Sequence, residues 1–411
     1  MKLRSICLSF HRLRFFCHAL AAFSAAGVAS GQDGPASLPE LPSGFYEAAA
    51  TVIGEEAEQS LRNLDLRLSL GTLYDTNVNQ GNDIGSRPAE SDFSIQPTLG
   101  GSYEIGSGNW RIGARGSLGR IHYLETSGFN ATNYSAGLLG KYKTEKVTAS
   151  VATGYSSNAG VNRFAGAFIA QKAFSNLAKI NYRLSSKTSA EMLWTQSSIA
   201  VETEGFADNS SFNFNAAALW KATPLVKLGP GFRYGVRTGF DDAEFTVAGP
   251  VLRADYNLST KVNLTSSVGL DFSEGTPEEN QLWNWRVGLK YRASVLWGLS
   301  LNMVRDTQAT LITGGGFDQI SSYQVAYNRK IRSASLQLGV AYIDRDPQGA
   351  VGVALGFRDS TSVDYTASLR FPIFGDEVDF NVNLAWRNLT TSDDLLSWDG
   401  FQSGLSLNWK F

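Results

Sequence analysis

Basic side chains recur at alternate positions in segments whose other positions are apolar. Between Leu64 and Leu70, Asp65 and Arg67 alternate with leucines, so polar and apolar side chains fall on opposite faces of an extended strand. Cations gathered on one wall can attract and orient anions, because walls of one sign focus the electrostatic potential. The candidate anion-binding positions are Arg67, Arg111, Arg115, Lys141, Arg183, Arg233, Arg253, Arg286, Arg370 and Arg387, with Lys179, Lys227, Arg237 and Lys290 on the same face.

The same polar face carries fewer acids and several neutral amides. The acids number seven against fourteen cations, although the whole chain has a formal charge of −2. If this face lines a pore, its charge should favour anions; the alternative is that these charges pair with one another and only keep the interior wet. The acids are Asp65, Glu191, Asp255, Asp271, Asp306, Asp364 and Asp379, and the amides include Asn181, Asn213, Asn215, Asn284, Asn302, Gln324, Asn381, Asn383 and Asn408.

Residues suited to catalysis or metal binding are scarce. Cys7 and Cys17 lie in an expected leader, which removes disulfides, thiolate zinc sites and cysteine nucleophiles from the mature chain. The single histidine outside the leader, His122, stands beside Tyr123 and is typical of a membrane interface. We therefore expect no enzyme, no metal and no cofactor.

Strands of period two must position the polar face. Apolar series alternate with polar residues in eighteen segments, most of them near the 9–11 residues that a tilted membrane strand needs. The last segment ends in Leu405, Leu407, Trp409 and Phe411 on one face, which resembles the terminal recognition signal of outer-membrane barrels. Pro97, Pro230 and Pro250 interrupt strands, and we expect a β-bulge at each; the alternative is a locally weakened wall.

The connections between the segments alternate between short and long. Short ones include 106–108, 144–146, 185–187 and 374–377, whereas long ones include 75–91, 156–167, 306–319 and 344–361. Outer-membrane barrels combine short periplasmic turns with longer extracellular loops. The sequence thus predicts an all-β fold: a transmembrane antiparallel up-and-down β-barrel of about 18 strands, with 16 to 20 possible.

The amino end predicts export. Residues 1–31 resemble a cleaved signal peptide, with four cations, an apolar stretch from Phe15 to Val28 and small residues before Gln32. Residues 32–60 contain three prolines and an alanine- and glutamate-rich run, which indicate a periplasmic linker with one possible short helix. The barrel is expected to occupy residues 61–411 and to lie in the bacterial outer membrane.

Composition separates a membrane barrel from other classes. Charged residues make up 18% of the chain, against about 25% in an ordinary soluble domain. Without the leader's four cations, 32 basic and 38 acidic side chains remain, which argues against nucleic acid as a partner. A large soluble all-β protein is the alternative, but aromatic strand ends such as Trp110, Trp220 and Trp386 favour the barrel.

The exit of the first strand, Leu70-Gly71-Thr72-Leu73-Tyr74-Asp75-Thr76-Asn77-Val78, resembles the opening of the beta-barrel porin family 2. The likeness extends from Leu61 to Phe411, although its motif is short. The resemblance implies an outer-membrane conduit that passes acidic or neutral exopolysaccharide with a periplasmic polysaccharide-export protein. In architecture alone the chain also resembles the alginate exporter.

Two other functions remain open from the sequence. One is a general or anion-preferring diffusion porin, which usually carries a long acidic constricting loop. The other is an adhesin or structural anchor with a plugged lumen, for which residues 47–60 could form the plug. Under every reading the expected partners are outer-membrane lipid, lipopolysaccharide and the barrel assembly machinery.

Overall fold

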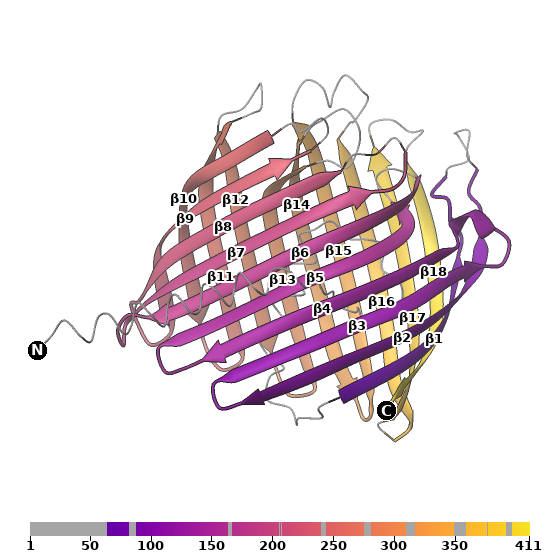
Figure 1. The fold of residues 1–411 in the computed structure, drawn as a ribbon, viewed down its shortest axis with the longest axis horizontal. Helices are drawn as coiled ribbons and strands as arrows, with labels where there is room; N and C mark the ends of the chain where they lie inside the picture. Colours follow the sequence, from indigo (N-terminus) through magenta and orange to yellow (C-terminus); the bar gives the residue numbers. More distant parts are fainter. Residues whose placement is uncertain are drawn as a thin grey trace, which may run out of the picture.

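The computed structural model is a closed barrel of antiparallel strands (Figure 1). The structure describes residues 64–411 except 82–87, 163–166, 205, 207, 240–243, 275–280, 310–316, 349–358, 376 and 392–396. The expected signal peptide and linker, residues 1–60, lie outside the described residues. Among the described residues no helix has the length and apolarity to cross a bilayer.

Eighteen strands form the barrel, as the sequence predicts. They are β1 (Leu64–Asp75), β2 (Asp92–Ser107), β3 (Trp110–Tyr123), β4 (Ala131–Lys143), β5 (Val147–Asn162), β6 (Ala167–Arg183), β7 (Thr188–Val201), β8 (Asn209–Lys221), β9 (Val226–Thr238), β10 (Glu244–Asn257), β11 (Val262–Glu274), β12 (Gln281–Arg292), β13 (Trp297–Ala309), β14 (Phe317–Ile331), β15 (Ala334–Gln348), β16 (Ser360–Phe374), β17 (Val378–Thr391) and β18 (Trp398–Lys410).

Each strand pairs antiparallel with its neighbours in sequence, and β1 pairs with β18 to close the sheet. The seam register places Leu70 opposite Leu407, and the Phe411 amide donates to the Leu66 carbonyl at 2.9 Å. The terminal aromatic strand thus completes the barrel. Closure matters because an open sheet edge would leave its backbone groups unpaired in lipid.

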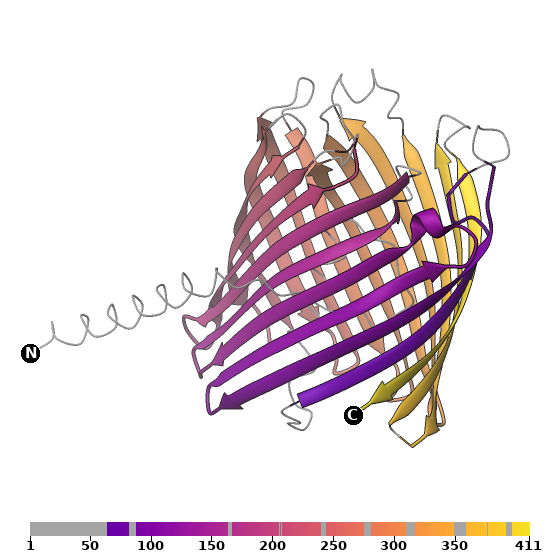
Figure 2. The ribbon, with the colours of Figure 1, turned by 45° about the vertical axis from the view of Figure 1, so that its right-hand side comes forward.

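The two ends of the barrel differ in their connections (Figure 2). At the turn end, which also holds the start of β1 and the end of β18, the strands are separated by two to four residues. At the loop end the longest separations are 76–91 and 349–359. Three expected loops are shorter than the sequence indicated, because β5, β13 and β15 continue to Asn162, Ala309 and Gln348.

The outer face is apolar and carries two belts of aromatic rings. Near the turn end Trp110 packs on Tyr142 with ring centroids 4.5 Å apart, and nearer the loop end Tyr134 packs on Tyr155 at 6.1 Å. Tyr142 and Tyr134 are eight residues apart on β4, which spans about 26 Å of strand at about 3.3 Å per residue. Tilted strands of this length fit the apolar band of a membrane barrel.

The strand prolines do not produce the expected bulges. β8 and β9 are unpaired at Gly229–Pro230, and their pairing continues beyond these residues in the same register. β10 and β11 are likewise unpaired at Gly249–Pro250, with the same register on both sides. Pro97 likewise leaves the β2–β3 register unchanged. The bulge prediction is therefore wrong, because the missing N–H is absorbed by local loss of pairing rather than by an extra residue.

Two glycines beside these prolines crease the barrel wall. A Cβ on Gly229 would lie 1.8 Å from the Ala218 carbonyl oxygen, and one on Gly249 would lie 1.9 Å from the Leu270 oxygen. Only a residue without a side chain permits this close backbone approach, which marks a tight bend in a barrel wall. The crease runs through adjacent strands, because Gly249 pairs with Arg233 and Gly229 pairs with Arg253.

Candidate anion-binding lumen

The polar face lies inside the barrel. Arg233 on β9 forms an ion pair with Asp306 on β13, four strands away, and such a contact can form only across the interior. From these two residues the strand pairing fixes the inward face of every other strand. All ten candidate cations lie on it, and their role in binding anions stays a prediction: Arg67, Arg111, Arg115, Lys141, Arg183, Arg233, Arg253, Arg286, Arg370 and Arg387.

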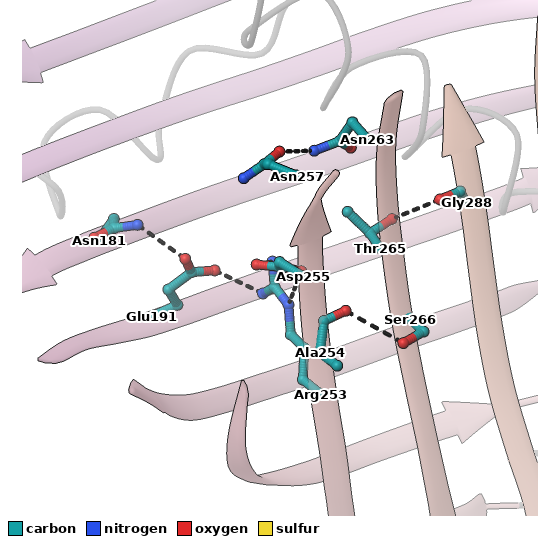
Figure 3. A network of polar contacts seen from close by, with 10 residues as sticks. All are labelled: Asn181, Glu191, Arg253, Ala254, Asp255, Asn257, Asn263, Thr265, Ser266 and Gly288. Atoms are coloured by element: carbon teal, nitrogen blue, oxygen red, sulfur yellow. Dashed lines mark hydrogen bonds and ion pairs between the residues drawn. The ribbon is translucent and has the colours of Figure 1, made fainter. Parts of the chain in front are cut away.

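One group of polar contacts, nearer the turn end, centres on Arg253 (Figure 3). Its guanidinium donates Nε and Nη2 to the two oxygens of Asp255, both at 3.2 Å, and Nη1 to Glu191 Oε2 at 2.6 Å. Asn181 Nδ2 donates to the other Glu191 oxygen at 2.9 Å. Because β6, β7 and β10 supply these groups, the network ties three separate strands together inside the lumen.

A second group, nearer the loop end, centres on Arg233. Its side chain is 9% exposed and bonds Asp306, while its Nη1 lies 3.3 Å from Asp271 Oδ2. Arg237 Nη2 lies 3.7 Å from Asp306 and donates to Asn213 Oδ1 at 3.1 Å. Two arginines therefore compensate two carboxylates, of which that of Asp271 is buried, so these four charges offer little net potential to a solute.

The crease brings these distant strands together. Four strand intervals cover about 19 Å of wall at about 4.8 Å each. Yet Cα atoms of β13 come within 8 Å of those of β8 and β9. The wall from β9 to β13 therefore folds sharply inward on this side of the barrel.

Apolar side chains also enter the lumen at the crease, which the sequence did not indicate. Phe245 and Val247 on β10 and Leu282 on β12 are buried and pack together on the inward face. Period two predicts alternation but not which apolar residues a bend will enclose. The lumen is thus filled locally by an apolar cluster beside the Arg233 network.

Other lumen cations near the turn end have acidic neighbours. Arg67 pairs with Asp65 at 3.0 Å, and Arg370 and Lys410 both contact Asp379. Arg111 lies 4.0 Å from Glu104. These pairs are partly exposed, so their charges are screened by water more than those of the crease.

Four lumen cations make no side-chain ion pair or hydrogen bond with the described part of the chain: Arg115, Lys179, Arg183 and Lys227. Three of them lie on β3 and β6, outside the creased wall from β9 to β13. Arg286, in the middle of β12, faces inward and is solvent-exposed. The interior therefore contains water-accessible space at that depth, lined by cations able to meet an anion.

The sequence reasoning omitted several charges that the structure places on the inward face. Glu104, Asp318, Arg345 and Lys410 all point inward, and Arg345 pairs with Asp318 between β15 and β14. The signal was available, because each falls on the polar phase of its strand. Glu104, Asp318 and Arg345 lie where the observed strands run beyond the apolar series of the sequence, whereas Lys410 lies within the series of the last strand.

The expectation that this chain is not an enzyme stays a prediction. His122 lies on the outward phase of β3, opposite Ile95, as expected of an interfacial residue. No cluster of three or more His, Cys, Asp or Glu there could hold a metal ion. The charged and amide side chains of the lumen can offer electrostatic recognition and hydrogen bonding.

No family model and no curated protein matches this sequence. Solved structures similar to it include the siderophore receptor PirA from Pseudomonas aeruginosa, with 9% identity over 86% of this chain and 81% of that chain, and a TM-score of 0.44. OccAB3 from Acinetobacter baumannii has 11% identity over 85% of this chain and 100% of that chain, with a TM-score of 0.43. The FrpB iron transporter from Neisseria meningitidis has 10% identity over 89% of this chain and 83% of that chain, and a TM-score of 0.45. The architecture described above rests on this chain's own strand pairing.

Proposed function

We propose that this chain is an outer-membrane conduit whose lumen prefers anions. A closed barrel with an apolar outer band between aromatic belts satisfies its backbone groups in lipid. By the usual arrangement of such barrels, the turn end faces the periplasm and the loop end faces outward. The barrel assembly machinery would insert it, and its outer face would contact lipid and lipopolysaccharide.

The observation that carries the preference for anions is the set of cations without ion pairs. Acids of the lumen are held by arginines, as in the Arg233 and Arg253 networks, whereas Arg115, Lys179, Arg183 and Lys227 face the lumen without an ion pair to the described part of the chain. Uncompensated charges on low-dielectric walls raise the local concentration of the opposite ion. The lumen should therefore admit anions in preference to cations.

Planar-bilayer recording of the purified protein tests this function. Across a salt gradient the reversal potential should have the sign of an anion-selective channel, and the selectivity should fall in high salt, which screens the wall charges. Changing Arg115, Lys179, Arg183 and Lys227 together to glutamine should reduce the selectivity for anions. Lys172→Gln is the matched control, because Lys172 pairs with Glu202 on the outer face of the same strand as Lys179. Cation selectivity, or no conductance, would contradict the proposal.

Exopolysaccharide is the second, narrower candidate cargo, delivered by a periplasmic export protein. The amides on the lumen wall support it, because they can donate to and accept from sugar hydroxyls along a neutral or acidic glycan. Asn181, Asn302, Gln324, Asn381 and Asn383 all lie on the inward phase of their strands. Deleting the gene should then trap glycan in the periplasm, whereas a diffusion porin would leave glycan secretion unchanged and an adhesin would change only attachment.

A further inference from the structure

Charge is unevenly distributed along the lumen. Within six residues of each strand's turn end, the inward positions of the described strands hold sixteen cations and five acids, whereas those farther out hold four cations and six acids. The turn-end cations are Arg67, Arg111, Arg115, Lys141, Lys143, Lys179, Arg183, Lys221, Lys227, Arg253, Arg286, Lys290, Arg292, Lys330, Arg370 and Lys410, against Asp65, Glu104, Glu191, Asp255 and Asp379. The loop-end charges are Arg233, Arg237, Arg345 and Arg387 against Asp75, Asp92, Asp271, Asp306, Asp318 and Asp364.

The acids of the loop-end half are held by the protein itself. Asp75 accepts from Gln402 Nε2 at 2.6 Å and from the Asn77 amide at 2.9 Å. Asp92 accepts from the Thr126 hydroxyl at 2.6 Å. With the ion pairs of the crease, these contacts leave the loop-end half close to neutral.

The turn-end half instead places like charges side by side. Arg111 lies directly opposite Lys141 in the β3–β4 ladder, and Arg67 lies directly opposite Lys410 in the β1–β18 seam. Like charges directly opposite each other destabilise a sheet. Glu104, Asp65 and Asp379 offset part of that repulsion, and a bound anion would offset more of it, so the arrangement favours a ligand of opposite charge.

The wall from β3 to β6 continues this pattern. Lys141 on β4 and Lys179 on β6 both pair with Ser150 on β5, so their backbones are about 10 Å apart at about 4.8 Å per strand interval. Arg183 follows four residues after Lys179 on the same face, and Arg115 stands on β3. Cations at such intervals suit a chain of linked anionic groups better than one small ion.

We propose that the turn-end part of the β3–β6 wall is a binding site for a linear polyanion that enters from the periplasmic mouth. Arg111, Arg115, Lys141, Lys179 and Arg183 form the site, and the near-neutral loop-end half gives the lumen an electrical polarity. The site rests on the proposed function. Because the attraction is confined to one end, the polymer should be captured from that side only.

Single-channel recording with a defined probe tests the site. The probe is a ten-residue oligo-L-glutamate, added to one side and then the other. Ser186→Cys in the β6–β7 turn fixes the orientation of each channel, because a membrane-impermeant thiol reagent reaches it from the turn end and the mature chain has no other cysteine. The probe should block current from the turn-end side at a concentration about tenfold lower than from the loop-end side, which corresponds to about 1.4 kcal/mol.

The triple variant Arg115→Gln/Lys179→Gln/Arg183→Gln should raise the turn-end blocking concentration about tenfold, again about 1.4 kcal/mol. Arg120→Gln is the matched control on β3, because Arg120 lies on the outer face, opposite Thr132, and should leave block unchanged. Heat-modified migration on gels confirms that both variants fold.

The possible outcomes separate the two proposals. A conducting anion-selective channel that is blocked equally from both sides, or whose block survives the triple variant, would overturn the polyanion site and leave the conduit standing. A folded barrel without conductance would overturn both. Sided block that disappears in the triple variant and persists in the Arg120 control supports the site.

Discussion

Arg233 stands directly across the β9–β10 ladder from Gly249, and its guanidinium forms an ion pair with Asp306 on β13. Gly249 leaves room for the backbone of β10 to approach the Leu270 carbonyl, and that bend brings β13 within reach of the Arg233 guanidinium. A second glycine–arginine pair lies four residues further along the same two strands, where Gly229 is opposite Arg253. The two arginines hold the crease that the two glycines permit.

The crease glycines should therefore tolerate no side chain. Gly249→Ala would place a Cβ 1.9 Å from a backbone oxygen, which only movement of the strand can relieve. We expect a loss of about 1–3 kcal/mol, typical of overpacking, in urea unfolding in detergent micelles followed by tryptophan fluorescence. Gly140→Ala is the control, because no atom lies within 4 Å of its Cβ position. Equal midpoints for the two variants would contradict the crease.

Removing the central cation of the Arg233 network should be costly. Arg233→Ala leaves Asp271, whose side chain is 1% exposed, and Asp306 without their main counter-charge, and breaking such a buried pair costs about 3–5 kcal/mol. Adding Asp271→Asn and Asp306→Asn should restore most of the stability, because the buried charges are then removed. Arg67→Ala, at a partly exposed pair, should cost about 0–1 kcal/mol in the same urea assay. An Arg233→Ala barrel as stable as Arg67→Ala would refute this role.

Adjacent residues on the last strand should respond oppositely to charge. Leu405→Arg places a cation against hydrocarbon on a side chain that is 48% exposed, and should cost about 2–4 kcal/mol near the bilayer midplane. Ser406→Arg, which points into the lumen beside Asn381, should be nearly neutral. Folding titrations into lipid vesicles measure both. Similar losses at both positions would contradict the inward and outward faces assigned to this strand.

The loop after β1 should stabilise the pairing of β1 with β18 through hydrogen bonds to β18. Asn77 donates Nδ2 to the Asp399 carbonyl at 2.7 Å and to the Gly81 carbonyl at 2.8 Å, while the Thr76 amide donates to Phe401 at 3.0 Å. Asn77→Ala leaves buried partners unsatisfied and should cost about 1–3 kcal/mol. Hydrogen exchange of the Thr76 and Phe401 amides should accelerate.

Asn79→Ala is the matched control for Asn77→Ala. Its side chain bonds only within the same loop, to Gly81, Pro88 and Glu90, and makes no contact across the seam. Exchange at Phe401 should stay slow in this variant. If both variants exchange alike, the Tyr74–Val78 segment only orders its own loop.

The sequence by itself determined the strands and their faces. Period two depends on local geometry alone, so the alternation around Leu64–Leu70 and Leu405–Phe411 identified strands, inward cations and closure of an even-numbered barrel. The short and long connections likewise gave its two ends. Strand limits were less certain, because beyond the apolar band nothing forces alternation, and β5, β13 and β15 continue past it.

Only the tertiary structure decided which lumen charges are available to a solute. Arg233 and Arg115 have the same phase and residue type, yet one is buried between two carboxylates and the other has no ion pair with the described residues. The difference comes from the crease at Gly229 and Gly249, which joins strands that are four intervals apart. Pairing across a lumen depends on the curvature of the whole wall, and no local pattern in the sequence encodes that curvature.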